Sequence, residues 1–206
     1  MDDLFTRYPS LVTCKDSIED AIKTIISCYD AGGKVLLCGN GGSAADCDHI
    51  VGELMKGFLK KRPIPADRRE SMRTRYTDID ESMLSKLQMG LPAISLPSVT
   101  ALNSAVANDI DGELVYAQGL LAMADERDVL IAISTSGNAA NVFHAVSVAK
   151  ALGVGVIGLT GKTGGRLAHL SDVCICVPEC ETYKVQELHL PVYHYICAAV
   201  EEHFFP

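Results

Sequence analysis

Several features that mark large protein classes are missing from this sequence. No apolar run reaches the length of a membrane-spanning helix, so the chain does not predict a transmembrane protein. Internal repeats and low-complexity tracts are also absent, which excludes a repeat architecture. Acidic residues outnumber basic ones, 26 to 18, and the net charge of −8 argues against general nucleic-acid binding.

The eight cysteines include no C-x-x-C pair. Three of them, Cys38, Cys174 and Cys176, lie in apolar runs, where reduced core thiols are the usual finding. The acidic start of the chain, Met1-Asp2-Asp3-Leu4, has no apolar stretch of the kind found in signal peptides. We therefore expect a cytoplasmic protein with reduced cysteines.

Apolar runs and helical patterns alternate along the 206 residues, of which 48% are hydrophobic and 21% charged. This composition predicts a single domain with a full core, residues 1–206. Strands covered on both faces are predicted at Val35–Cys38, Ala93–Leu96, Val129–Ser134, Val154–Leu159 and Val173–Val177. Helices are predicted at Ser17–Tyr29, Ser43–Phe58, Gly112–Ala124, Ala139–Leu152 and Tyr183–Phe204. The alternation predicts an α/β fold in which helices sandwich a five-stranded parallel sheet.

A basic excursion at about residues 56–90 interrupts this alternation. It has no strand pattern, contains Pro63 and Pro65, and shows only a weak helical pattern after its acidic part at 78–81. Its basic side chains include Lys56, Lys60, Lys61, Arg62, Arg68, Arg69, Arg73 and Arg75. Two hypotheses stand. The excursion is either a solvated, partly mobile loop, or a lid whose arginines contact a phosphate bound in the same or in a neighbouring subunit.

Two short polar segments each follow an apolar run and open into a helical pattern. They are Cys38-Gly-Asn-Gly-Gly-Ser-Ala-Ala45 and Ser134-Thr-Ser-Gly-Asn138. Each places backbone N–H groups and hydroxyls at a helix N-terminus, where the helix dipole favours an anion. In a parallel sheet, both segments lie beyond the carboxyl ends of strands, where ligands bind. The pair predicts a site for a phosphorylated ligand.

Two nucleotide-binding motifs are only partly matched. Gly39-x-Gly41-x-x-Ala44 fits the start of a dinucleotide fingerprint, but no acidic residue closes a second strand about 20 residues later. Gly161-Lys162-Thr163 resembles the end of a Walker A motif, but Val156 stands where its first glycine is required. A turn after a strand explains this second segment better.

Candidate acid–base or metal-binding residues lie in two of the helical patterns. His49 and Glu53 are four residues apart, which places their side chains on one helix face, about 6 Å from each other. This pair suits zinc binding, proton transfer or an ordinary surface ion pair. On a helix, Gln186 and His194 lie about 80° apart around the axis and about 12 Å apart along it. This spacing alone favours two surface residues over two ligands of one metal ion.

Taken together, these segments resemble the sedoheptulose 7-phosphate isomerases, also called phosphoheptose isomerases, of the sugar isomerase (SIS) superfamily. The resemblance rests on Cys-Gly-Asn-Gly-Gly-Ser-Ala-Ala-Asp-x-x-His-x-x-x-Glu-Leu at 38–54, Asn108-Asp109, Ile133-Ser-Thr-Ser-Gly-Asn138, and Val185-Gln-Glu-x-His189 with His194. It covers about residues 15–203 apart from the excursion. It implies the SIS fold with flavodoxin-like topology, and a homotetramer with active sites at subunit interfaces.

The resemblance also implies the members of the site and the reaction. Zinc would be ligated by His49, Glu53, Gln186 and His194. Substrate contacts would come from Asn40, Gly41, Gly42, Ser43, Glu53, Asn108, Asp109, Ser134, Thr135, Ser136 and Gln186. The reaction would convert D-sedoheptulose 7-phosphate to D-glycero-D-manno-heptose 7-phosphate, a precursor of lipopolysaccharide and other surface heptoses. Glu53 and His194 would be the acid–base pair of an enediol mechanism.

The sequence departs from the family pattern at Ala139, where the isomerases often have a serine, and in the length and basic character of the excursion. Two alternatives therefore remain. One is a non-catalytic SIS regulator that binds the bacterial replication initiator, and the other is an isomerase of a shorter sugar phosphate. The presence of Glu53, Gln186 and His194 together favours catalysis over the regulator.

Overall fold

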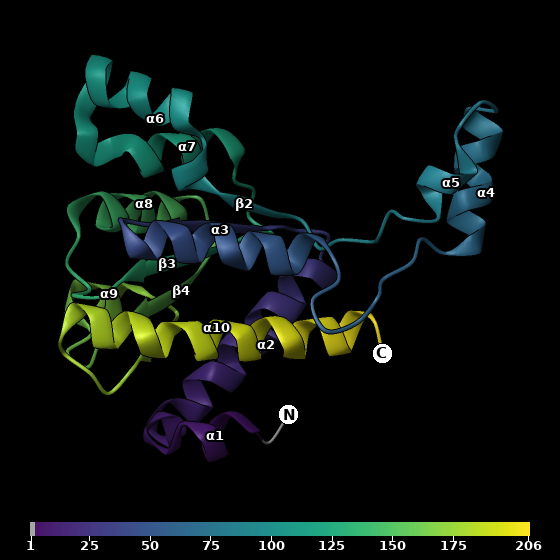
Figure 1. Cartoon of the computed structure of the whole chain (residues 1–206). Helices are drawn as coiled ribbons and strands as arrows, with labels where there is room; N and C mark the ends of the chain where they lie inside the picture. The colour runs from purple at the N-terminus through teal and green to yellow at the C-terminus, as the bar shows by residue number, and fades with distance from the viewer. Residues whose placement is uncertain (1–2) are drawn as a thin grey trace.

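The structure, a computed structural model, describes residues 3–206 and is built around a five-stranded parallel sheet (Figure 1). The strand order is β2-β1-β3-β4-β5, which is the flavodoxin-like order. The strands are β1 (Val35–Gly39), β2 (Ala93–Ser95), β3 (Val129–Ser134), β4 (Gly155–Thr160) and β5 (Val173–Cys176). All five predicted strands are present, and the predicted fold class is confirmed.

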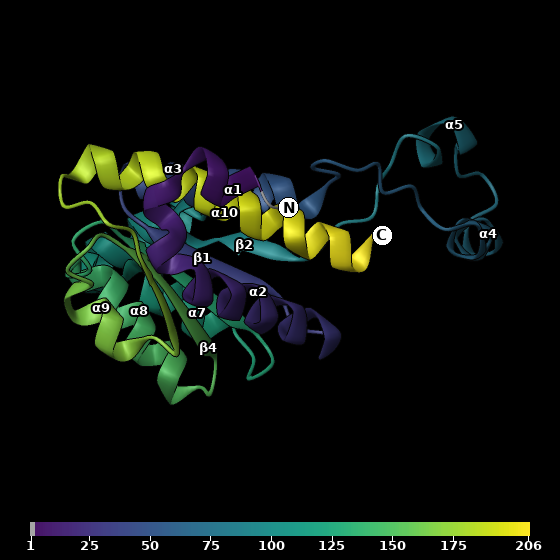
Figure 2. The same ribbon diagram turned by 90° about the horizontal axis from the view of Figure 1, so that it is seen from below.

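Helices cover both faces of the sheet (Figure 2). One layer contains α1 (Asp3–Arg7), the short helix η1 (Pro9–Cys14), α2 (Lys15–Asp30), α3 (Gly42–Met55) and α10 (Thr182–Phe204). The opposite layer contains α6 (Thr100–Val106), α7 (Val115–Met123), α8 (Ala140–Ala151) and α9 (Gly165–Leu170). The short turns η2 (Leu96–Ser98), η3 (Ala107–Asp111) and η4 (Gly112–Leu114) connect β2 to α7. None of the helices in residues 3–206 is long and apolar enough to cross a membrane.

Alternation along β1 shows why the sheet needs two helical layers. Val35 and Leu37 pack into the core beneath α2, α3 and α10, whereas Leu36 and Cys38 pack into the core beneath α7 and α8. Because successive side chains of a strand point to opposite faces, a continuous apolar run must be covered on both sides. The five predicted helices therefore appear, with ends that differ by a few residues; α3 ends at Met55 rather than at Phe58.

Helices α3 and α10 lie side by side and run in the same direction (Figure 1). At their beginnings, Gly42 meets Gln186 so closely that a Cβ on Gly42 would lie 2.5 Å from the Gln186 amide nitrogen. Two turns further along, His49 meets Tyr193 at 3.0 Å. A larger residue at position 42 would displace the Gln186 amide from this position, so the absence of a side chain at Gly42 lets Gln186 lie against the start of α3.

The far ends of the two helices are tied together by the buried carboxylate of Glu201 on α10. It accepts hydrogen bonds from the backbone N–H groups of Phe58 (2.8 Å), Leu59 (2.7 Å) and Lys60 (3.1 Å), which follow α3. The Nε of Arg62 donates a fourth at 2.8 Å, and both charged side chains are at most 1% exposed. Burial alone would raise the pKa of Glu201, but these donors hold it below its usual value.

The guanidinium of Arg62 extends this connection back to α3. It donates to the backbone carbonyls of Leu54 (2.6 Å) and Glu53 (3.1 Å) in the last turn of the helix, and the Leu54 carbonyl also accepts from the N–H of Leu91 at 2.9 Å. It also stacks over the Phe205 ring, with 4.7 Å from the guanidinium carbon to the ring centroid. Among the basic residues of the excursion, Arg62 is therefore a structural residue of the core rather than a solvated one.

The rest of the excursion projects from the body as an arm, residues 63–88 (Figures 1 and 2). It contains α4 (Ala66–Arg75) and α5 (Glu81–Leu84), and a single antiparallel bridge between Pro63 and Gln88 closes its base. Helix α4 has no buried residue, which explains why apolar periodicity did not predict it. Arg69 and Arg73 pair with Glu81, and this holds α4 against α5. The hypothesis that the excursion is a lid stays a prediction. Of the four arginines in the arm, Arg69 and Arg73 are already paired with Glu81.

Replacing Glu201 by Gln tests the connection between α3 and α10. The substitution keeps the size of the side chain but leaves the buried Arg62 without an opposite charge. Because breaking a buried pair on one side costs about 3–5 kcal/mol, we expect the free energy of unfolding in urea to fall by about 3 kcal/mol.

Glu202→Gln is the matched control, since it breaks the adjacent but half-exposed pair with Lys60, whose Nζ–Oε2 distance is 2.7 Å. An exposed pair contributes about 0–1 kcal/mol, so the loss should be that small. Equal losses for the two variants would contradict the role given to Glu201.

Candidate active site

The two predicted polar segments meet in a pocket of about 320 Å³ at the carboxyl ends of β1 and β3. Its lining residues are Asn40, Gly41, Gly42, Ser43, Ile133, Ser134, Thr135, Ser136, Ala139, Thr182 and Gln186. Eight of the eleven residues predicted to contact substrate are among them. Among residues 3–206, no Lys or Arg lines the pocket, so any anion there would be held by hydroxyls and backbone N–H groups.

Asn40, at the start of the first segment, is held by side chains from the opposite layer. Its amide exchanges two hydrogen bonds with the amide of Asn141 on α8, at 2.8 and 2.9 Å. The Tyr116 hydroxyl from α7 lies 3.0 Å from Asn40 Oδ1 and 2.7 Å from the carbonyl oxygen of Gly39. Sequence reasoning missed Asn141 and Tyr116, because nothing in their spacing connects them to Asn40.

The second segment is fixed by its contact with the turn before α9. Gly137 adopts φ +66°, and a Cβ there would lie 2.0 Å from the carbonyl oxygen of Gly164, so glycine is required. Asn138 Oδ1 accepts a hydrogen bond from the backbone N–H of Arg166 at 3.1 Å. The Ser136 hydroxyl accepts one from the N–H of Asn138 at 3.2 Å. The segment therefore presents its polar groups to the pocket from a rigid support.

Helix α8 begins directly at the pocket with a residue that cannot cap it. Ala139 occupies the N-cap position with extended backbone angles, φ −61° and ψ 124°, and supplies no side-chain hydrogen bond. The first N–H groups of a helix have no partners inside the helix. The N–H of Val142 donates to Asn141 Oδ1 at 2.9 Å, so the first N–H groups before it, beside the pocket residue Ala139, are the ones left for an anion.

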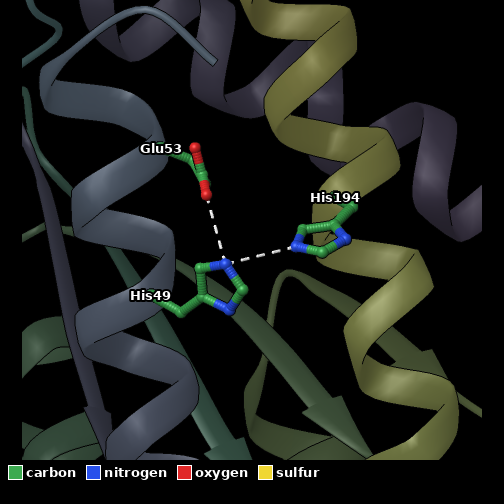
Figure 3. A group of neighbouring side chains, drawn as sticks. All are labelled: His49, Glu53 and His194. Carbon is green, nitrogen blue, oxygen red and sulfur yellow. Dashed lines mark hydrogen bonds and ion pairs between the residues drawn. The ribbon is translucent and has the colours of Figure 1, made fainter. Parts of the chain in front are cut away.

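Three side chains of α3 and α10 converge two helical turns away from the pocket (Figure 3). His49 Nε2 lies 3.1 Å from Glu53 Oε1 and 3.4 Å from His194 Nε2. One ligand atom from each of the three residues lies within 4.8 Å of the other two. The i, i+4 spacing on α3 predicted the first pair, while only the packing of α10 on α3 brings in His194.

The chemistry of this cluster suits a bound metal ion. Two imidazoles and one carboxylate, with ligand atoms within 4.8 Å of one another, form a typical zinc-binding set. Burial and the neighbouring His49 lower the pKa of His194, and the nearby Glu53 opposes this shift. A neutral His194 keeps a lone pair for a metal ion or a proton. The residues present therefore fit a divalent metal site.

Other side chains complete the surroundings of the cluster. The second oxygen of Glu53 accepts a hydrogen bond from Lys56 Nζ at 3.2 Å. On its other side, His49 Nδ1 lies 3.0 Å from the hydroxyl of Tyr193, which donates to Asp46 Oδ1 at 3.1 Å. Sequence reasoning passed over Lys56, Asp46 and Tyr193. Asp46 stands one helical turn before His49, and that i, i+3 spacing was the available signal.

The remaining predicted site residues lie apart from this cluster. Gln186 packs against Gly42 in the pocket, eight residues before His194 on α10. Asn108 and Asp109 are exposed on η3, where the Asn108 amide donates to the Asp109 carboxylate at 2.6 Å. Neither of these two residues lines the pocket.

His189, which belongs to the motif of the last helix, is a core residue. It is fully buried on α10, and its burial lowers its pKa to about 4. This imidazole belongs to the buried interior and is not part of the cluster of His49, Glu53 and His194.

Comparison with known proteins identifies the family. Models of the SIS domain match residues 10–85 and 104–196. The phosphoheptose isomerase of Aneurinibacillus thermoaerophilus is 39% identical over 188 residues, which cover 91% of this chain and 82% of that protein. The enzyme of the same name from Rhodospirillum rubrum is 37% identical over 97% of this chain and 91% of its own length. This chain belongs to the phosphoheptose isomerase family.

Solved structures agree with this membership. The phosphoheptose isomerase of Neisseria gonorrhoeae aligns with a TM-score of 0.71 at 28% identity, over 97% of this chain and 98% of that one. The phosphoheptose isomerase of Francisella tularensis gives 0.72 at 28% identity, over 98% and 97%. The family predicted from the sequence is confirmed, and with it the class of activity: a sugar-phosphate isomerase.

A serine at position 139 is expected to cap α8. Since an N-cap Ser in place of Ala stabilises a helix by about 0.5–2 kcal/mol, Ala139→Ser should raise the free energy of unfolding in urea by about 1 kcal/mol. Ala140→Ser, at the first residue inside the helix, is the control and should give no gain. A variant at 139 that is no more stable than the control would show that α8 does not use position 139 as its cap.

Proposed function

We propose that this chain interconverts D-sedoheptulose 7-phosphate and D-glycero-D-manno-heptose 7-phosphate, as a step toward surface heptoses. The observation that carries the proposal is the arrangement along α3, which begins in the pocket at Gly42 and holds His49 about 10 Å further along its axis. A long sugar phosphate can place its phosphate in the pocket while C1 and C2 reach the cluster. This separation favours a seven-carbon substrate over a shorter one.

The pocket would anchor the phosphate. Ser134, Thr135 and Ser136 offer hydroxyls, and the uncapped N-terminus of α8 offers N–H groups and the positive end of its dipole. Anchoring the non-reacting end of the sugar orients the reacting carbons, and this converts binding energy into a lower barrier.

The cluster would hold zinc through His49, Glu53 and His194, and the family resemblance adds Gln186, which lies at the pocket, as the fourth ligand. When bound, zinc would polarise the sugar carbonyl and stabilise the negative charge that develops on its oxygen. The support for this assignment is the convergence of three lone-pair donors within 4.8 Å and the typical zinc chemistry of the set.

Glu53 and His194 would move the protons. The isomerisation removes a proton from C1 of the ketose and delivers one to C2, while the hydroxyl proton of O1 is lost and O2 gains one, through an enediol. Glu53 takes the C1 proton, and His194, from the facing helix, is the second acid–base group. Lys56 Nζ donates a hydrogen bond to the Glu53 carboxylate at 3.2 Å and so orients it.

We further propose a cytoplasmic homotetramer with its active sites at subunit interfaces. All eight cysteines are unpaired, as expected in a reducing compartment. Asn108 and Asp109 are exposed rather than part of the pocket, which is what an interface position requires. In such an assembly these two side chains reach substrate where one chain faces another.

Steady-state kinetics with zinc and sedoheptulose 7-phosphate test the proposal. Wild-type protein should form the aldose, and Glu53→Gln or His194→Gln should lower kcat by at least about 10²–10⁴-fold, the usual contribution of a general acid or base. His144→Gln, on α8 beside Glu113, is the control and should keep full activity.

Turnover is followed by NMR of the aldehyde product, and a five-carbon ketose phosphate is assayed in parallel. Wild-type protein that leaves the seven-carbon ketose unchanged would reject the proposed activity. A higher kcat/KM for the five-carbon substrate would move the assignment to the shorter sugar.

A further inference from the structure

The side chain of Tyr193 reaches across from α10 to the ring of His49, although its neighbour in sequence, His194, faces the cluster. Tyr193 is only 3% exposed, and its ring centroid lies 5.5 Å from that of His49. Its hydroxyl lies 3.0 Å from His49 Nδ1 and 3.1 Å from Asp46 Oδ1. One hydroxyl thus joins a carboxylate to the nitrogen of His49 that points away from Glu53 and His194 (Figure 3).

The direction of these two hydrogen bonds follows from the number of protons. A tyrosine hydroxyl carries one proton, and an ionised carboxylate can only accept. With Asp46 ionised, Tyr193 donates to Asp46 and its oxygen accepts from His49 Nδ1–H. The Glu53 carboxylate beside Nε2 is the competing acceptor for the proton of His49, and a bound cation between them would remove that competition. The lone pair of the neutral imidazole is then on Nε2, the atom that lies 3.1 Å from Glu53 Oε1 and 3.4 Å from His194 Nε2.

Asp46 is suited to hold Tyr193 in this orientation. Its second oxygen, Oδ2, is buried and has no hydrogen-bond partner within residues 3–206, so the bond from Tyr193 supports the burial of this carboxylate. Losing that donor would leave both carboxylate oxygens poorly satisfied. The hydrogen bond between Tyr193 and Asp46 therefore holds the tyrosine hydroxyl in place and also satisfies the buried carboxylate.

We propose that Tyr193, oriented by Asp46, is a positioning residue that fixes His49 in the tautomer whose Nε2 lone pair faces the metal site. The inference rests on the zinc site proposed above. Groups that hydrogen-bond the second nitrogen of a metal-binding histidine fix its tautomer and ring orientation, and removing one typically weakens metal binding about 10–100-fold. Tyr193 is a positioning residue because it acts through His49 and touches no metal or substrate.

The test measures tautomer and affinity separately. Long-range ¹H–¹⁵N NMR on metal-free, ¹⁵N-labelled full-length protein reports which nitrogen of His49 carries the proton. Wild-type protein should show the proton on Nδ1, and Tyr193→Phe should lose that preference. Competition with a chromophoric chelator should show zinc binding to Tyr193→Phe that is about 10–100-fold weaker than to wild type.

Tyr195→Phe is the matched control. It removes a hydroxyl two residues along the same helix, from a ring that packs on Phe5 at 5.8 Å between centroids. Its zinc affinity and its His49 tautomer should equal those of wild type. Because the wild-type tautomer is measured without any substitution, the inference can be tested even if Tyr193→Phe fails to fold.

The outcomes separate this inference from the proposed metal site. A wild-type His49 with its proton on Nε2 overturns the inference, and so does equal zinc affinity of wild type and a folded Tyr193→Phe. In the second case the metal site itself stands. Wild-type protein that binds no zinc overturns both the metal site and the role given to Tyr193.

Discussion

The buried carboxylate of Glu201 is the constraint on which the arrangement of the site depends. Burying a charge costs several kcal/mol unless donors surround it, and here three backbone N–H groups and Arg62 do so. Through Arg62 the same network reaches the last carbonyls of α3, beside Glu53. The end of α3 is therefore held against α10, while at the other end the Gln186 side chain lies against Gly42.

Along the axis of α3 and α10, two different kinds of functional group lie at two different positions. Their beginnings meet the pocket, where N–H groups and hydroxyls replace the cationic side chains that many phosphate sites use. Two turns later their facing sides bring two imidazoles and a carboxylate together. In the proposed function, the phosphate of the sugar binds in the pocket and its reacting carbons meet the cluster of His49, Glu53 and His194.

Much of this could be predicted from the sequence, and the failures have physical reasons. Continuous apolar runs predicted all five strands, because a buried parallel strand has few alternatives. The spacing of His49 and Glu53 is local and was interpreted correctly, whereas His194 joins them only through tertiary packing. The roles of Arg62 and Tyr193 depend on partners more than 130 residues away, and no periodicity reveals such contacts. Helix α4 was missed because it buries nothing.

The central claim is that α3 and α10 together form one metal site beside a phosphate pocket. Anomalous X-ray diffraction at the zinc absorption edge, on crystals grown with zinc and sedoheptulose 7-phosphate, tests it most directly. The account predicts one strong peak per chain within about 2.0–2.2 Å of His49 Nε2, His194 Nε2 and a Glu53 oxygen, with the sugar phosphate against Ser134–Ser136. A peak bound elsewhere, or a phosphate outside this pocket, would contradict it.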